Sequence, residues 1–276
     1  MTAEVKEKKR ARDSYITEHI HLHYMECAKH YGNNNVWATM LYGSQNYGLD
    51  TPDSDIDTKT LLLPDPRDVI LGTKMVSTDL QISDGGLSNV KDYRAMFQNY
   101  LKGNINFIET LYTKYARVNL DYGDLFMKLR SERDLIANCQ PRKLIHMAAG
   151  MANQKYTAFE KPFESKKEVL EKYLYDPKQL HHLCRLNLFI ENYCTNMDFE
   201  TALSFHTVRQ HIYLYDLKTK PLPYEQAVAL KERTMVEINN MVEWADAHLP
   251  EDNGYEEAKN FLDNLSVEVF LNFLNK

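Results

Sequence analysis

The chain has 276 residues, which is enough for one large domain or two modest ones. Hydrophobic residues make up 43% of it, an ordinary share for a globular protein with a buried core. A formal net charge of −6 excludes a general nucleic-acid coat protein, which carries a basic excess, but leaves room for a local basic groove. No apolar run approaches the roughly 20 residues that a membrane helix needs, so we expect no membrane partner.

None of the cysteine spacings is typical of a zinc site; the cysteines are Cys27, Cys139, Cys184 and Cys194. We expect buried thiols, which fit a reducing compartment. Residues 1–13 are charged and no apolar segment follows them, so they lack the pattern of a signal peptide. These features predict a cytoplasmic protein.

The N-terminal half alternates between helix and strand patterns. A first helix is expected over residues 14–31, because Ile16 and Ile20 recur at helical spacing. On that helix His19 and His23 share one face, which we interpret as solvated surface. The later patterns predict a helix over 92–101 and strands over 36–42, 55–63, 74–82 and 107–112.

Beyond about residue 120 the strand patterns vanish and long helical patterns take over. They predict helices over 142–159, 177–193, 224–247 and 255–274. Residues 206–223, which contain prolines, are predicted to be a linker between helices. The expected fold class is therefore α+β: a small mixed β-sheet domain with helices over residues 1–125, followed by an all-helical domain over residues 126–276.

The densest functional signal lies where the first predicted strand ends. Gly43-Ser44 closes that strand, and after a polar loop Asp55-Ile-Asp57 opens the next one. A glycine lets the main chain approach a bulky anion closely. Because side chains two apart on a strand share a face, Asp55 and Asp57 are expected to point together, with Ile56 in the core. Two carboxylates beside a small-residue turn suit Mg²⁺ or Mn²⁺ held together with substrate phosphates.

This order of elements favours phosphoryl-transfer chemistry. In a two-metal site the paired ions clamp the attacking and the leaving oxygen of an in-line displacement. The alternative is an Asp-rich turn between two strands, which needs no ligand.

The arrangement resembles the polymerase-β-like nucleotidyltransferase superfamily, whose signature is Gly-Ser, a loop, and then a pair of acids on the next strand. A fuller string is similar to the predicted nucleotidyltransferases of bacterial and phage RNA-repair clusters: Gly43-Ser44-x-x-Tyr47-Gly48-Leu49-x-Thr51-Pro52-x-Ser54-Asp55-x-Asp57. One position departs, because that family usually carries Gly where this chain has Thr60. The resemblance implies that Gly43 and Ser44 cradle the phosphates of an NTP. Tyr47 either stacks on a base or packs the loop down.

The superfamily usually adds a third carboxylate from a later strand, and this chain offers Glu109, Asp79 and Asp84. Glu109 lies in an apolar run, where a carboxylate is costly to bury unless it is paired or ligates a metal. A segment resembling Lys102-Gly-Asn-x-Asn-x-x-Glu109 recurs in the RNA-repair-associated family, which favours Glu109. Asp79 and Asp84 stay open as alternatives.

A second candidate site opens the helix predicted from residue 177. Asp176 is a suitable N-cap for this helix. Lys178, His182 and Arg185 fall on one stripe near the positive end of the helix dipole, an arrangement that suits a phosphate. The alternative is a solvated helix face. The family carries a similar Lys-x-x-x-His-x-x-Arg-Leu element, which implies that Lys178 and Arg185 hold the triphosphate.

Together these features predict a metal-dependent nucleotidyltransferase. It would move an NMP from an NTP, bound between the two domains, to an acceptor hydroxyl, with release of pyrophosphate. Asp55, Asp57 and Glu109 would bind two Mg²⁺ or Mn²⁺ ions. The resemblance implies an RNA end, such as that of a tRNA, as the acceptor. Transfer to a protein hydroxyl and a catalytically silent nucleotide-binding module are the alternatives.

Overall fold

The computed structural model describes residues 3–51, 54–72, 75–161, 167–205 and 207–274. The chain forms two compact units: unit 1 comprises residues 1–101, 106–136 and 256–276, and unit 2 comprises residues 102–105 and 137–255. The predicted α+β class is confirmed, with a mixed sheet in unit 1 and a helical unit 2. The sequence analysis places the last helix in the helical domain, whereas this helix lies in unit 1.

Within the described residues, five strands form one sheet in the order β3-β4-β2-β1-β5. Their bounds are β1 (Val36–Tyr42), β2 (Asp57–Leu62), β3 (Ser77–Gln81), β4 (Leu87–Asp92) and β5 (Ala116–Val118). The pair β2–β4 is parallel and the other pairs are antiparallel. Strand β4 was not predicted from the sequence. Two of its three buried positions are polar, Ser88 and Asp92, so it lacks the alternation of apolar residues that marks a half-buried strand.

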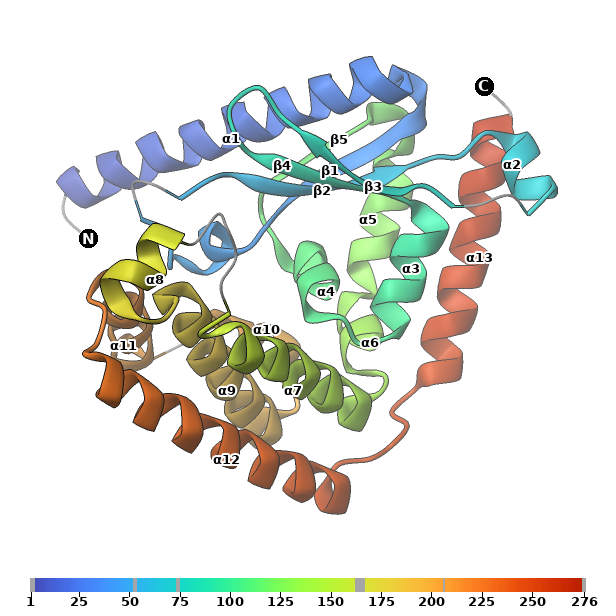
Figure 1. The fold of residues 1–276 in the computed structure, drawn as a ribbon. Coiled ribbons are helices and arrows are strands. Elements are labelled where there is room, and N and C mark those ends of the chain that lie inside the picture. Colours follow the sequence, from blue (N-terminus) through green and yellow to red (C-terminus); the bar gives the residue numbers. More distant parts are fainter. Residues whose placement is uncertain (1–2, 52–53, 73–74, 162–166, 206, 275–276) are drawn as a thin grey trace. The chain divides into compact units, whose positions relative to one another are not determined.

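Helices cover both faces of this sheet (Figure 1). On one face α1 (Ala3–Tyr31) packs against β1, β2 and β5. Ile16 and Ile20 of α1 join Leu41, Ile56 and Tyr115 in one buried apolar cluster. The other face carries α3 (Tyr93–Leu101), α4 (Ile105–Tyr112) and α5 (Gly123–Ser131). The sheet therefore has one side that α1 covers and one side that α3, α4 and α5 share.

The strand predicted over residues 107–112 is wrong, because these residues belong to helix α4. Ile108 and Leu111 are fully buried at a spacing of one helical turn. A short apolar run has no periodicity long enough to separate a strand from a buried helix. The predicted strand over residues 74–82 is confirmed as β3, although Lys74 lies outside the described residues.

Helix α13 (Tyr255–Leu274) returns to pack beside α3 and α5. Tyr93 Oη donates a hydrogen bond to the Ser266 carbonyl at 3.3 Å. Lys128 Nζ lies 2.6 Å from the Glu268 carboxylate. The end of the chain thus completes the helical side of unit 1.

Polar contacts join α1 to the turn between β3 and β4. The Asp84 carboxylate lies 2.5 Å from His19 Nδ1 and 3.2 Å from His23 Nε2. The other ring nitrogen of His23 lies 2.8 Å from Thr58 Oγ1. The prediction of a solvated face is wrong for His23, which has no exposed surface, because the β3–β4 turn covers it.

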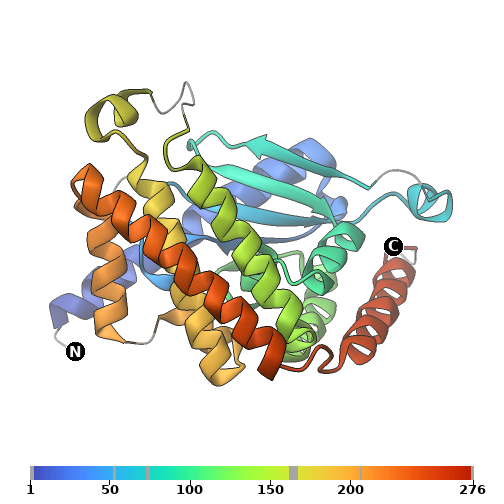
Figure 2. The same ribbon diagram turned by 60° about the horizontal axis from the view of Figure 1, so that its bottom comes forward.

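Unit 2 is built on α7 (Pro141–Ala158), α9 (Pro177–Asn196) and α12 (Tyr224–His248), which pack on one another (Figure 2). These helices and α13 confirm the four predicted in the second half. The predicted linker is wrong over residues 208–219, which form α11 (Val208–Thr219); His206 lies outside the described residues. Leu214 and Leu217 bury one side of α11, and the Thr207 hydroxyl caps its first turn.

The remaining elements are short. They are η1 (Asn33–Asn35), η2 (Ser44–Tyr47), α2 (Pro66–Ile70), η3 (Leu120–Tyr122), α6 (Arg133–Asn138), α8 (Lys167–Tyr173) and α10 (Phe199–Ser204). All the cysteines lie in described segments, and each is a buried thiol, as predicted. No helix in the described part of the chain is long and apolar enough to cross a bilayer.

Candidate functional site

The Gly-Ser turn sits at the end of β1, where the chain leaves the sheet. Gly43 has φ +88°, a conformation that side-chain-bearing residues rarely adopt. A Cβ at this position would meet nothing within 4 Å, so conformation rather than space requires the glycine. Ser44 then begins the turn η2, and Gly48 closes it in the left-handed region with a hydrogen bond to the Ser44 carbonyl.

Side chains from outside the loop hold it in place. Arg12 of α1 donates to the Asp50 carboxylate at 2.6 Å and to the Gln45 carbonyl at 2.9 Å. Asn46 donates to the Leu41 carbonyl at 3.0 Å and accepts from the Thr113 hydroxyl at 2.6 Å. The turn that follows Gly43 is therefore held by Arg12, which precedes it in the sequence, and by Thr113, which follows it.

The two acids of the motif have different surroundings. Asp57 opens β2, is half-buried, pairs in register with Tyr42 of β1, and accepts from the Leu87 amide at 3.2 Å. Asp55 precedes the strand and is exposed, so strand alternation does not govern its direction. Ile56 is buried, as predicted. Pro52 of the motif lies outside the described residues.

Glu109 reaches the Gly-Ser turn from helix α4. Its side chain is buried, with 1% of the residue's surface exposed. Its Oε1 accepts a hydrogen bond of 2.5 Å from the Gly43 amide. The structure thus brings together a glycine and a carboxylate that are far apart in the sequence. The Gly43 N–H is thus paired with a carboxylate of the protein itself.

Two side chains of this face were not predicted as site residues from the sequence. Tyr42 lies opposite Asp57, and burial, together with the charges of Asp57 and Glu109, raises the pKa of its phenol. Lys59 follows Asp57 at the strand spacing of two and is buried between rings. The spacing Asp57-x-Lys59 could have predicted this lysine, because side chains two apart on a strand lie on the same face.

The other two candidates for the third acid lie on different sides of the sheet. Asp79 of β3 is in register with Asn89 of β4 and accepts a hydrogen bond from the Asn89 side-chain amide at 2.6 Å. Asn89 is in turn in register with Lys59 of β2. Its charge raises the pKa of Lys59, so it belongs to the same face as Asp57. Asp84 is held by the α1 histidines on the opposite side.

Thr60, the position that departs from the resembled family, also faces α1. Its hydroxyl lies 2.9 Å from that of Thr39 and 2.8 Å from that of Ser88, and Cys27 Sγ is 3.6 Å away. This departure therefore belongs to the packing of α1 and leaves the face of Asp57 untouched.

The donor set on the Asp57 face fits a hard divalent cation. Carboxylate oxygens are the ligands that Mg²⁺ and Mn²⁺ prefer. The charges of Asp57 and Glu109 both raise the pKa of Tyr42, beside the larger effect of burial, and both oppose the lowering of the pKa of Lys59 by burial. No group of three or more His, Cys, Asp or Glu side chains among the described residues is close enough to hold a metal alone.

A group of cationic side chains lies in unit 2, where α7 packs on α9. Asp176 caps α9 through the Lys178 amide, as predicted. Lys178 is exposed, whereas Arg185 is 4% exposed. Lys155 of α7, which the sequence analysis did not choose, joins them: burial and the charges of Arg185 and Lys178 lower its pKa. We call Lys155, Lys178 and Arg185 the α7–α9 cation cluster.

His182 lies on the predicted stripe but carries no positive charge near neutral pH. Burial and the neighbouring Arg185 lower its pKa well below the ordinary value. Its neighbour His181 is 2% exposed and lies 3.0 Å from the Leu214 carbonyl through Nδ1. Because a carbonyl only accepts, Nδ1 of His181 carries a proton. Burial and Arg185 lower the pKa of the ring to about 3, so it is neutral near pH 7. Near neutral pH the positive charge of the predicted stripe therefore comes from Lys178 and Arg185.

The neutral state of His181 predicts a loss of stability in acid. Burial and Arg185 lower the pKa of His181 to about 3, whereas in the unfolded chain it returns to about 6.5. Between these values the unfolded state binds more protons, so stability falls as the pH falls. At pH 5 this group costs about 2 kcal/mol.

Urea unfolding at pH 7 and pH 5 measures the effect. In His181→Gln the free energy of unfolding should change less between the two pH values than in the wild type. An equal change in both proteins would contradict the assignment, since His23 and His182 titrate in both.

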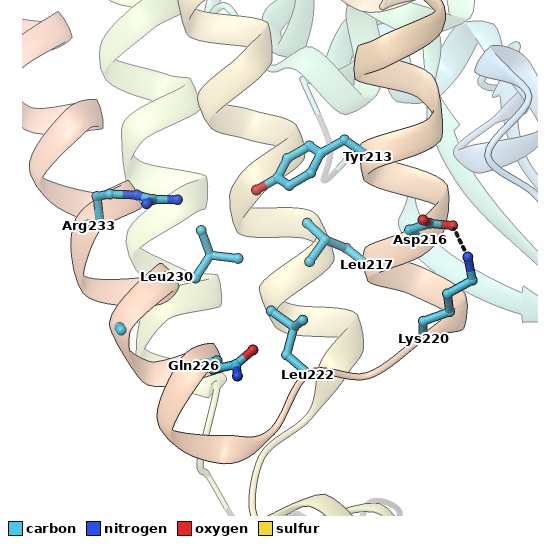
Figure 3. Close-up of a pocket in the computed structure, with 9 residues that line it drawn as sticks. Tyr213, Asp216, Leu217, Lys220, Leu222, Gln226, Leu230 and Arg233 are labelled. Atoms are coloured by element: carbon cyan, nitrogen blue, oxygen red, sulfur yellow. Dashed lines mark ion pairs between the residues drawn. The ribbon is translucent and has the colours of Figure 1, made fainter.

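A separate groove of about 540 Å³ lies between α11 and α12 of unit 2 (Figure 3). Leu217, Leu222 and Leu230 converge on its centre. Two of its charged side chains have acidic partners: Lys220 lies 2.9 Å from Asp216, and Arg233 lies 3.6 Å from Glu237. None of the site residues predicted from the sequence lines this groove.

Comparisons with known proteins assign this chain to no family. A scan against protein-family models finds no match for the chain, and a search of curated proteins finds no match either.

Proposed function

We propose that this chain is a metal-dependent nucleotidyltransferase that moves an NMP from an NTP to an acceptor hydroxyl, with release of pyrophosphate. One observation supports this proposal above the others. The Gly43 amide donates to the Glu109 carboxylate beside the register pair of Tyr42 and Asp57. The Gly43-Ser44 turn and two of the proposed acids thus lie at one end of the sheet, although they come from different elements.

In the proposed reaction the acceptor oxygen attacks the α-phosphorus. A new P–O bond forms, the bond from the α-phosphorus to the bridging oxygen breaks, and pyrophosphate carries away the electron pair. Asp55, Asp57 and Glu109 would hold Mg²⁺ or Mn²⁺, which neutralises charge on the phosphates and on the leaving group. We assign to Glu109 the acceptance of the hydroxyl proton, because its buried carboxylate is fixed by the Gly43 amide.

The remaining residues position the nucleotide. We assign phosphate contacts in unit 1 to Ser44 and to the main chain of the Gly43-Ser44 turn. For unit 2 the resemblance implies that Lys178 and Arg185 bind phosphate. Lys155 extends the same assignment, because its charge adds to that of these residues. His182 is a neutral hydrogen-bonding group in this proposal, and Tyr47 is the candidate for contact with the base.

The acceptor is proposed to be an RNA end, and the test separates RNA from protein. Each α-³²P-labelled NTP is incubated with Mg²⁺ or Mn²⁺, the protein, total RNA and cell lysate, beside an Asp57→Asn control. Label that survives protease, but not nuclease, supports an RNA acceptor. Label that survives nuclease identifies a protein hydroxyl instead. Metal-dependent nucleotide binding without any transfer of label would replace the proposal with a silent binding module.

A further inference from the structure

Lys59 is a buried ammonium group on the same face as the proposed acids. Only 4% of its surface is exposed, although lysine is rarely buried unless its charge is balanced. Its Nζ lies 3.9 Å from the ring centre of Tyr42 and 4.1 Å from that of Phe107. Two aromatic faces therefore hold the ammonium in place, an arrangement that stabilises a cation through the ring quadrupoles.

The charges around Lys59 come from the proposed site. Burial lowers the pKa of Lys59 to about 8, and the carboxylates of Glu109, Asp79 and Asp57 oppose this change. A second cation, Lys91, lies 5.3 Å from the other ring contact, Phe107. The face that carries Asp57 thus contains positive charge of its own, which the rings of Tyr42 and Phe107 hold in place.

We propose that Lys59 makes this face select a divalent cation that arrives with a triphosphate over the same cation alone. This inference rests on the proposed function. A bare divalent ion placed among the acids is repelled by the ammonium, whose position the two rings fix. A triphosphate brings several negative charges, so it attracts both the ion and Lys59. The site would then fill with metal and nucleotide together.

A purely structural role for Lys59 predicts something different. If the ammonium only balanced the acids in the fold, its loss would shift the two affinities in the same direction or in neither. The selective role predicts shifts of opposite sign. Removing the charge should tighten the binding of the bare ion and weaken that of the metal–nucleotide complex.

The test measures binding to the full chain without turnover. Titration calorimetry gives the affinity for Mn²⁺ alone and for Mn²⁺ with the α,β-methylene analogue of each NTP, in which the scissile oxygen is replaced. The variants are Lys59→Met, which keeps the length of the side chain between the rings, and Lys59→Gln. Lys59→Arg keeps the charge and should restore the wild-type order. Lys29→Gln, an exposed lysine of α1, is the matched control.

We expect Lys59→Met to bind Mn²⁺ alone about tenfold tighter and Mn²⁺ with the analogue about tenfold weaker. Unchanged affinities, or two changes of the same sign, in the variant that folds by circular dichroism would overturn the inference. If the wild type binds the complex and Asp57→Asn loses it, nucleotide binding at the acids stands whatever Lys59 does, and the label-transfer assay decides the proposed function. If the wild type binds neither probe, both proposals fail.

Discussion

Asp57→Asn should reduce nucleotidyl transfer by about a thousandfold or more, which corresponds to roughly 4 kcal/mol of lost transition-state stabilisation. The substitution keeps the shape of the side chain and removes its charge. Since Asp57 is half-buried at the start of β2 and its Oδ1 accepts from the Leu87 amide, the asparagine oxygen can keep that contact. The fold should therefore survive while the charge needed at the metal is lost.

The measurement is transfer of label from an α-³²P-NTP under single-turnover conditions, beside a thermal unfolding curve. Asp124→Asn, an exposed aspartate in the first turn of α5, is the matched control and should keep full activity. A Tm close to that of the wild type would exclude unfolding as the cause of any loss. An active, folded Asp57→Asn protein would show that the acid pair has no catalytic role.

Gly86→Ala should destabilise the protein by about 3 kcal/mol or more, which lowers the Tm of a chain of this size by roughly 10 °C. A Cβ at Gly86 would lie 2.2 Å from the Ile56 carbonyl and 3.0 Å from the ring of His23. The carbonyl belongs to the backbone between Asp55 and Asp57 and has little freedom to move. The buried ring of His23 is held by Thr58 and Asp84.

Differential scanning calorimetry of Gly86→Ala beside Gly123→Ala measures this effect. Gly123 opens α5 with ordinary helical φ, and a Cβ there meets nothing within 4 Å. The alanine at that position should be neutral or slightly stabilising, because it restricts the unfolded chain. Equal Tm values for the two variants would mean that the turn can move away from Ile56 at little cost.

Much of the fold follows from periodicity alone. The helices α7, α9, α12 and α13 are long enough for a helical pattern to repeat several times, and their ends fall close to the predicted ones. Short elements give weaker patterns. Helix α4 shows only an apolar run, and β4 buries Ser88 and Asp92, so neither has the signal that its structure requires.

The residues of the candidate site also differ in how well the sequence predicts them. Gly43, Ser44 and the acids lie close together in the sequence, so their spacing carries the prediction. Glu109 could be chosen from its apolar surroundings, but its contact with Gly43 depends on where α4 lies on the sheet. Lys59 was missed because a lysine in a strand usually marks an exposed position, whereas this one is buried against the rings of Tyr42 and Phe107.

The order of the compact units has a consequence for synthesis. Unit 1 is made of residues 1–101, 106–136 and 256–276, so the whole of α7 to α12 is translated before α13. Chains emerge from the ribosome at about 5–20 residues per second, and units form as their sequence becomes available. Unit 2 can therefore fold while α3 and α5 still lack the partner that Ser266 and Glu268 bring. A nascent chain therefore holds this helical side uncovered for several seconds before residues 255–274 emerge.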